Sequence, residues 1–490
     1  MYFVIKVQNK RIMNFTDAQQ ATTASALAAA YARRELTPTQ VAERCLARAQ
    51  TARGVFTQLT VSRALAQAER ATARWRAGTP LGPMDGVPLT WKDLFDIRGT
   101  PTTAGSALLA HAEPAKADAT LVAHAEAAGM VCIGKTNLSE FAYSGLGLNP
   151  FFGTPVNPAL GTRARAPGGS SSGAALAVAL GIAPIGIGTD TAGSVRVPAS
   201  FNGLVGYRAS RLRHAMTGVF ALAPSLDTVG PLAHSVADCI AMDAVLQGGR
   251  GDEARELLAG GFDAARRTLA QQTFVVDPAI LDSERVTTAV RENLRARMRW
   301  LRAAGATVVE REAKSLHLVQ ALIDNHGWLG ASEAFAIHQA RLDAPQAEAM
   351  DPRVRRRLEA ARDVSAARYL HLRWERQRLI AAFERDLEGA TLVLPATAHT
   401  APLLQPLEAD DELFARTNLA TLRLTMPGSF LDTPAVAMPS GVERVAAPDG
   451  STDLLPTGLQ LMRPRGEDAR LLQIALSLGH LFSSPHFKEQ

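Results

Sequence analysis

Between residues 173 and 207, short helix-forming runs alternate with short strand-forming runs, and small residues separate them. GAALAVALG (173–181) predicts a helix, and APIGIGT (183–189) predicts a strand. VPASFNG (197–203) then predicts a short helix or turn, and LVGY (204–207) predicts another strand. Helices that alternate with strands in this way indicate an α/β fold with a mainly parallel sheet.

The rest of the 490-residue chain continues this alternation, with one long helical stretch. Residues 22–77 show apolar spacing near the helical period, and Thr37-Pro38-Thr39 is typical of a helix start. Residues 252–390 predict helices with two strands, FVVD and TVVER, and residues 391–465 return to strands. The sequence shows neither a repeat of fixed period nor a low-complexity linker, which favours one continuous body.

We therefore predict a single domain over residues 25–485, preceded by an N-terminal extension at residues 1–24. Residues 250–390 are expected to form a helical cap on the substrate side of this domain. Met13 is an alternative start of the chain, which would make residues 1–12 an upstream extension.

Composition and charge narrow the class of protein. Apolar residues make up 47% of the chain and charged residues 20%, which excludes wholesale disorder. The net charge of +5 is small for this length, and the arginine-rich stretch 353–357 is typical of a solvated helix face. We therefore expect no nucleic-acid partner. The apolar run before Lys6 is too short for a signal peptide or a membrane span, so we expect no membrane association.

Cysteine and histidine bear on redox state and metal binding. Cys45, Cys132 and Cys239 lie far apart among apolar or helical neighbours, which predicts buried thiols rather than a disulfide framework. A reducing, cytoplasmic location follows as the expectation. The 11 histidines show no spacing typical of a metal site, so we expect no metal and no cofactor.

Two short motif matches are interpreted as coincidental. Residues 129–136 fit the phosphate-loop pattern, but the variable positions of the motif are apolar and predict a strand rather than a loop. Residues 169–173 fit the G-x-S-x-G nucleophile elbow, but no buried strand precedes them. We expect at least one of these serines to cap the N-terminus of the following helix.

The segment GTDTAGS (188–194) overlaps the end of a predicted strand and consists mostly of small residues. Successive backbone N–H groups of small residues can form a nest for an oxyanion. Ser194 then lies where a nucleophile would be placed, directly before a helical turn. No base lies close to it in the sequence, so the base must come from another part of the chain.

Two of the seven lysines are candidates for that base. Lys92 and Lys135 both end apolar strands, where burial lowers the pKa of a lysine and allows the neutral amine to accept a proton. Either lysine could instead form a salt bridge at its strand end, with Asp93 or Glu140 close by in the sequence. The sequence leaves both interpretations open.

Several segments together resemble the amidase signature family. The match is carried by GVPLTWKDLFD (86–96), APGGSSSGAALAVALG (166–181) and PIGIGTDTAGSVRVPASFNGLVG (184–206), and it extends over about residues 25–480. The resemblance implies the fold of that family, which is a central mixed, mainly parallel β-sheet with helices on both sides.

The resemblance also implies a Ser–Ser–Lys triad. Carried over by matching motifs, Ser194 would be the nucleophile, Ser170 the bridging serine and Lys92 the base, with a cis peptide bond before Ser170. Alanine stands at 192 where the family commonly has glycine, but its N–H group is retained. The implied oxyanion hole consists of the backbone N–H groups of Thr191, Ala192, Gly193 and Ser194, and the implied supporting residues are Asp190, Arg196 and Gly169.

The function implied by this resemblance is the hydrolysis of a small-molecule carboxamide to a carboxylate and ammonia or an amine, through an acyl-enzyme. A glutaminase-type subunit of a tRNA-dependent amidotransferase and a non-catalytic binding protein are the alternatives. Family members are often homodimers, so a homodimer is expected. Candidates for an apolar substrate pocket, each of which could equally belong to the core, are Phe141, Tyr143, Leu146, Phe151 and Phe152.

Overall fold

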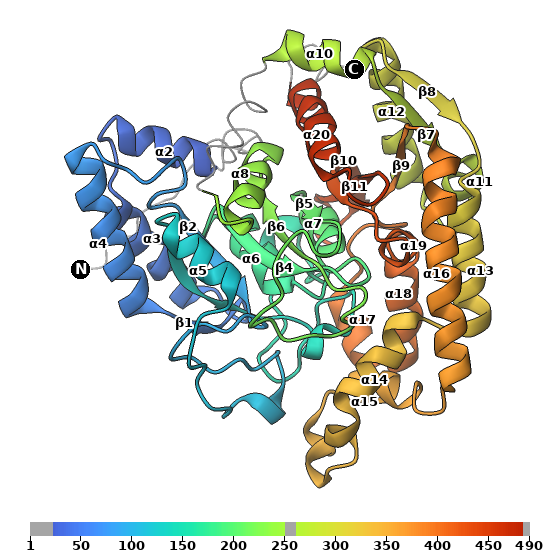
Figure 1. The fold of residues 1–490 in the computed structure, drawn as a ribbon, viewed down its shortest axis with the longest axis horizontal. Coiled ribbons are helices and arrows are strands. Elements are labelled where there is room, and N and C mark those ends of the chain that lie inside the picture. The colour runs from blue at the N-terminus through green and yellow to red at the C-terminus, as the bar shows by residue number, and fades with distance from the viewer. Residues whose placement is uncertain (1–22, 250–260, 484–490) are drawn as a thin grey trace.

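The computed structural model describes residues 23–249 and 261–483. Within these ranges one sheet of eleven strands runs across the molecule (Figure 1). The interpretation of residues 1–12 as an upstream extension lies outside the described residues. In chain order the strands are β1 (Phe56–Leu59), β2 (Pro88–Lys92), β3 (Val131–Thr136), β4 (Ile185–Thr189), β5 (Val205–Arg208), β6 (Val229–Ala233), β7 (Thr273–Val276), β8 (Thr307–Glu310), β9 (Thr391–Pro395), β10 (Ala435–Ala446) and β11 (Thr452–Met462).

The sheet is mixed, with the strand order β1-β3-β2-β4-β6-β5-β10-β11-β9-β7-β8. Parallel pairs join β3, β2 and β4 towards one end and β9, β7 and β8 at the other. The remaining pairs are antiparallel. The α/β class and the mixed sheet are confirmed, but the expectation of mainly parallel pairing is wrong. The centre of the sheet holds the hairpin β10–β11, and a tight turn can only join antiparallel strands.

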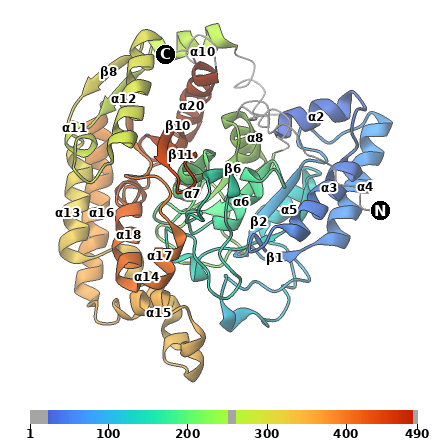
Figure 2. The same cartoon turned by 180° about the vertical axis from the view of Figure 1, so that it is seen from behind.

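Helices cover both faces of this sheet, as predicted (Figures 1 and 2). They are α2 (Ala24–Ala32), α3 (Pro38–Thr51), α4 (Val61–Ala77), α5 (Thr120–Ala127), α6 (Ser172–Ala179), α7 (Arg196–Asn202), α8 (Val236–Leu246), α10 (Phe262–Ala270), α11 (Pro278–Leu281), α12 (Thr288–Ala303), α13 (Lys314–His326), α14 (Leu329–Leu342), α15 (Pro352–Glu359), α16 (Ala366–Leu387), α17 (Leu404–Ala409), α18 (Asp411–Leu422), α19 (Met426–Phe430) and α20 (Asp468–Ser483). Alternate residues of β3 face opposite helical layers. Val131 and Ile133 pack in a cluster with α3, α6 and α7, whereas Cys132 packs in a cluster with α5 and α8.

Two local predictions are confirmed in detail. Helix α3 begins at Pro38, and the Thr37 hydroxyl and the Gln40 side chain form a capping box with each other's backbone N–H groups. The three cysteines are buried and free. Within the described ranges, we find no helix with both the length and the apolar character needed to cross a bilayer.

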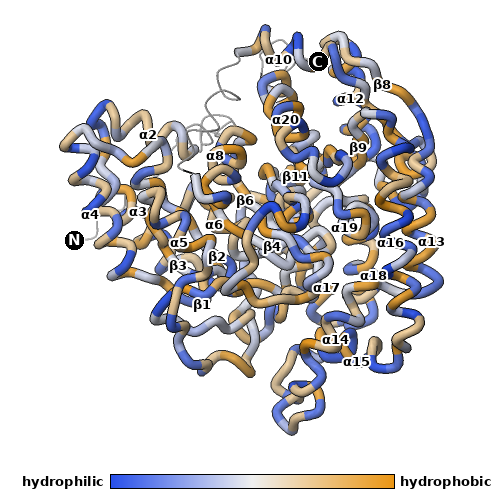
Figure 3. Tube along the Cα trace, viewed as in Figure 1, coloured by the Kyte–Doolittle hydropathy of each residue, from blue (hydrophilic) through white to orange (hydrophobic). Residues whose placement is uncertain are grey.

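The described part of residues 250–390 supplies helices α10 to α16 and adds β7 and β8 to the edge of the sheet (Figure 1). Helix α16 buries Leu372, Leu379 and Phe383, and hydrophilic stretches alternate with these along the helix (Figure 3). This is the pattern of an amphipathic helix with one solvated face. The role of this region as a substrate-side cap stays a prediction.

Candidate active site

The site is built where β2 and β4 end. These strands are parallel neighbours, so their carboxyl ends lie at the same edge of the sheet. Lys92 is the last residue of β2, and its Nζ donates hydrogen bonds to Ser170 Oγ at 2.6 Å and to Thr189 Oγ1, at the end of β4, at 2.9 Å. The Gly169–Ser170 peptide bond is cis. The end of β2, the Ser170 loop and the end of β4 thus meet at the Lys92 amine.

The environment of Lys92 favours a neutral amine. The side chain is completely buried, and burial lowers its pKa to about 7, against the opposing effect of Asp190 and Asp227. Within the described ranges, no carboxylate forms a salt bridge with Lys92. At neutral pH a substantial fraction of this lysine can therefore accept a proton.

Lys135, the other candidate base, has a different environment. Its Nζ lies 2.7 Å from Asp93 Oδ1, and it also donates to the Pro101 carbonyl at 2.7 Å and to Thr102 Oγ1 at 2.9 Å. Burial lowers the pKa of Lys135, and the Asp93 carboxylate opposes this shift. Lys135 lies in β3, so the interpretation of residues 129–136 as strand rather than phosphate loop is confirmed.

The loop that carries Ser170 is held by close backbone approach. Ser170 accepts hydrogen bonds at its carbonyl from the N–H groups of Ser139 at 3.2 Å and Ser172 at 2.9 Å. A side chain at Gly169 would collide with the backbone of Gly147, so only glycine fits there. The Ser171 N–H donates to the Ser194 carbonyl at 3.2 Å, which places Ser194 beside this loop.

The expected serine cap at the start of α6 is wrong. The N-cap residue Ser171 makes no side-chain hydrogen bond to the first N–H groups of this helix, and no other described serine does. The hydroxyl of Ser170 is bonded to Lys92, and the hydroxyl of Ser171 donates to the Thr189 carbonyl at 3.4 Å. The loop therefore directs two of its hydroxyls towards the strand ends rather than along the helix.

A buried ion pair fixes the turn that holds Ser194. Asp190 receives hydrogen bonds from Arg196 Nε and Nη2, each at 3.0 Å, and from the Val195 N–H at 3.2 Å. Burial alone would raise the pKa of Asp190, but Arg196 and Arg208 together lower it to about 2. Arg196 also donates to Ser429 Oγ at 2.7 Å. The carboxylate is thus ionised and ties the two ends of the turn together.

Further side-chain hydrogen bonds hold the segment between Asp190 and Ser194 in place. Thr191 Oγ1 donates to Asp227 at 2.6 Å, and Thr425 Oγ1 donates to the Ala192 carbonyl at 2.6 Å. Gly193 has a φ of +139°, and a side chain there would collide with the Thr425 hydroxyl. The backbone N–H groups of residues 191–194 donate no hydrogen bond to any described residue, which leaves them available to a ligand oxygen.

The candidate pocket residues are placed in two kinds of environment. Phe141, Tyr143 and Leu146 are buried in apolar clusters. Phe151 is 54% exposed, packs edge-on against Phe152, and lines a cavity of about 220 Å³. The structure therefore does not bring these side chains together into one pocket.

Three residues at the site were missed by sequence reasoning as individual contributors. Thr189 lies inside the segment that we assigned to an oxyanion nest, yet its side chain is a partner of Lys92. Asp227 lies within SLDTVGP (225–231), another segment that resembles the family, but nothing in the sequence pairs it with Thr191. Thr425 lies more than 200 residues after Ala192 in the sequence, and no local sequence pattern marks it as a site residue.

Comparisons with known proteins identify the family of this chain. A family model described as Amidase matches residues 40–472. The chain is 33% identical over 466 residues to 2-amino-5-chloromuconic acid deaminase of Comamonas testosteroni, covering 94% of this chain and 96% of the relative. It is 32% identical over 498 residues to a subunit of glutamyl-tRNA(Gln) amidotransferase from Ralstonia nicotianae, covering 93% and 96%.

A solved structure described as a crystal structure of amidase has the same fold. Its TM-score is 0.78 at 31% sequence identity, and the match covers 93% of this chain and 99% of the other. The family model and both relatives span nearly the whole chain. The protein therefore belongs to the amidase signature family.

Proposed function

We propose that this protein hydrolyses the carboxamide of a small molecule to a carboxylate and ammonia or an amine, through an acyl-enzyme on Ser194. The observation that carries the proposal is the 2.6 Å hydrogen bond between Lys92 Nζ and Ser170 Oγ. A buried lysine that faces a hydroxyl rather than a carboxylate can be neutral near pH 7 and accept the proton of that hydroxyl.

In the acylation step, neutral Lys92 accepts the proton of Ser170 while Ser170 accepts the proton of Ser194. Ser194 Oγ attacks the amide carbonyl carbon and forms a tetrahedral oxyanion. When the C–N bond breaks, the same relay returns the proton to the leaving nitrogen. A water molecule then gives its proton to the relay and attacks the acyl ester, which releases the carboxylate and restores Ser194.

The oxyanion is assigned to the backbone N–H groups of residues 191–194. Such groups stabilise charge that develops in the transition state, because they are already oriented before the reaction. Support for this assignment comes from the contacts that hold the segment, namely Thr425 on the Ala192 carbonyl and Asp227 on Thr191. Asp190 and Arg196 would position the turn, and Gly169 would allow the Ser170 loop to approach closely.

The substrate's acyl group would lie beside the Ser170 loop. Segment 139–147 contacts this loop, since the Ser139 N–H donates to the Ser170 carbonyl and the Gly169 N–H donates to the Gly145 carbonyl. Phe141, Tyr143 and Leu146 belong to this segment and remain candidates for the pocket wall. Phe151 follows it and is the accessible candidate.

Reaction with a fluorophosphonate probe tests the proposal without knowledge of the substrate. We expect one adduct, located on Ser194 by peptide mass spectrometry, and no adduct in Ser194→Ala. Lys92→Ala should slow labelling by about a hundredfold or more, because the relay loses its base. Ser172→Ala is the matched control, since Ser172 is a buried serine at the start of α6, next to the Ser170 loop, whose hydroxyl has no partner within the described ranges. Labelling of another residue, or equal labelling of Lys92→Ala, would contradict the assignment.

A second candidate function is that of a glutaminase-type subunit, favoured by the full-length similarity to a component of glutamyl-tRNA(Gln) amidotransferase. Such a protein would require partner chains, whereas an independent amidase would act alone. Release of ammonia or amine from a carboxamide panel by the purified chain would favour the first candidate. Activity that appears only with a co-purified partner would favour the second.

Light scattering on the purified chain tests the proposed homodimer.

A further inference from the structure

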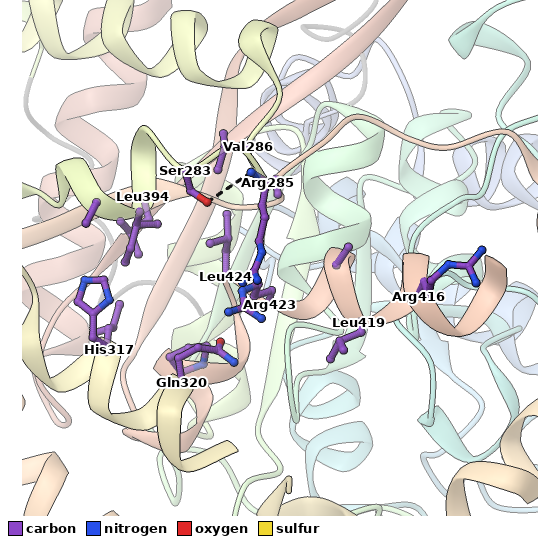
Figure 4. A pocket seen from close by; sticks show the side chains of 16 residues that line it. Ser283, Arg285, Val286, His317, Gln320, Leu394, Arg416, Leu419, Arg423 and Leu424 are labelled. Carbon is purple, nitrogen blue, oxygen red and sulfur yellow. Dashed lines mark hydrogen bonds between the residues drawn. The ribbon is translucent and has the colours of Figure 1, made fainter. Parts of the chain in front are cut away.

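A cavity of about 650 Å³ lies between the loop after α11, helix α13 and the segment formed by α18 and α19 (Figure 4). This volume is in the range of small-molecule binding sites. Leu316, Leu394 and Leu424 contribute apolar walls. No residue of the proposed triad or oxyanion hole lines the cavity.

The charge around this cavity is of one sign. Arg285, Arg416 and Arg423 line it, and none of the described lining residues is a carboxylate. His317 also lines the cavity, but its Nε2 is bonded to the buried carboxylate of Asp277 at 2.8 Å. A cavity with apolar walls and arginines but no lining carboxylate favours a ligand that is both apolar and anionic.

Two of these arginines converge. Figure 4 shows the side chains of Arg285 and Arg423 directed towards one another above Gln320, while Arg416 points away from them. Burial lowers the pKa of Arg423, and the nearby charge of Arg285 lowers it further. Two cations held close together repel each other, and an anion between them would remove that repulsion.

Arg416 pairs with Glu412 at 3.6 Å, but the two converging arginines have little competing pairing. Arg423 reaches Asp324 only at 3.7 Å, and half of the Asp324 side chain is exposed. Within residues 23–249 and 261–483, no carboxylate forms a salt bridge with Arg285. A guanidinium without a close carboxylate can form a bidentate pair with a carboxylate ligand.

We propose that this cavity binds an organic carboxylate with an apolar body. The carboxylate lies between Arg285 and Arg423, and the apolar body packs against Leu316, Leu394 and Leu424. An inorganic anion would leave these walls uncovered, and a neutral apolar molecule would leave Arg285 without an anionic partner and would not relieve its repulsion with Arg423. The inference goes beyond the proposed amide hydrolysis and does not depend on it.

Calorimetric titration of the full-length protein with octanoate tests this inference, and octan-1-ol supplies the same apolar body without the charge. We expect octanoate to bind with a stoichiometry of one in this cavity and at least about tenfold more tightly than octan-1-ol. Because no turnover is measured, failure of the proposed amidase activity would not affect the result. Equal binding of the two probes, or no binding of octanoate, would overturn the proposal.

Variants locate the binding site. Arg423→Gln should weaken octanoate binding by roughly tenfold, since one charged partner is lost. Ala420→Trp, on an exposed position of α18 that lines the cavity, should abolish binding while both converging arginines remain. Arg378→Gln is the control, because Arg378 is an exposed arginine of α16 paired with Glu375. Unchanged binding in both cavity variants would place octanoate elsewhere, such as in the proposed active site, and would refute the inference.

Discussion

The carboxyl ends of β2 and β3 carry the same kind of side chain in opposite electrostatic settings. Both strands place a buried lysine at or near their end, and the strands are parallel neighbours, with Trp91 opposite Lys135. Lys92 faces two hydroxyls, whereas Lys135 faces the Asp93 carboxylate. Burial lowers the pKa of both lysines, but only Lys135 has a direct carboxylate partner that holds the proton in place. The neighbour, rather than burial alone, decides which lysine can act as a base.

The largest expected effect comes from replacing each lysine by arginine. Lys92→Arg should lower kcat/KM by about a thousandfold, because a guanidinium keeps its proton and cannot serve as a base. Lys135→Arg preserves the charge opposite Asp93 and should lower the kcat/KM of the folded fraction by less than about tenfold. Steady-state kinetics with an amide found in the panel, together with circular dichroism to confirm folding, measures both. Similar losses in the two variants would remove the distinction between the lysines.

Removing the Asp93 carboxylate should lower the stability of the protein and leave its activity largely unchanged. Asp93→Asn leaves the buried Lys135 ammonium without its partner, which we expect to cost about 3–5 kcal/mol of unfolding free energy. Chemical denaturation followed by circular dichroism measures this loss. The folded fraction should retain its activity, because Asp93 is bonded to Lys135 and Thr103 rather than to Lys92 or Ser170. As a control, Glu375→Gln removes a partly exposed surface pair and should leave the denaturation midpoint unchanged.

The pH dependence of kcat/KM should reflect the titration of Lys92. Because its neutral form is required and its pKa is lowered to about 7, kcat/KM should fall about tenfold per pH unit below 7 and level off above it. The stability effect has a defined sign as well. Between pH 7 and the ordinary lysine pKa near 10.5, the unfolded chain binds more protons at this residue, so its contribution to folding stability rises with pH.

A pH–rate profile of the wild type, compared with denaturation at pH 7 and pH 10 for the wild type and Lys92→Met, measures both quantities. The methionine variant should lose the part of the pH-dependent stability that belongs to Lys92. An activity that stays constant between pH 5 and pH 8 would be inconsistent with a lysine base of this pKa.

The elements around the site could be predicted from the sequence because each depends on a local pattern. The apolar run 183–189 became β4, and the Thr37-Pro38 signal became the start of α3. Strand β6 was not assigned as a strand, because Gly230 and Pro231 interrupt the pattern that marks one. The resemblance to a known family supplied the pairing of Lys92 with Ser170, which no local pattern contains.

Contacts between distant segments could not be predicted. The choice of Asp93 as the partner of Lys135 depends on how the chain turns after β2, and the sequence alone allowed the same partner for Lys92. Thr425 supports the Ala192 carbonyl only because α19 packs beside the turn that holds Ser194. The sequence therefore identified residue types suited to catalysis, while the fold determined which of them share hydrogen bonds.

The smallest expected effect concerns the second hydroxyl on Lys92. Thr189 Oγ1 accepts a hydrogen bond from the Lys92 amine at 2.9 Å, and such a bond is stronger when the amine is charged. Thr189→Val keeps the shape and removes the acceptor, at a net cost of about 0.5–1.5 kcal/mol, so the pKa of Lys92 should fall by up to about one unit. The inflection of the pH–rate profile should move downwards by that amount, while kcat/KM at pH 8 changes by less than about tenfold. A purely structural role for Thr189 would lower activity at all pH values without moving the inflection. Thr189→Ser retains the hydroxyl and should restore the wild-type profile, which separates the loss of the hydrogen bond from the loss of packing.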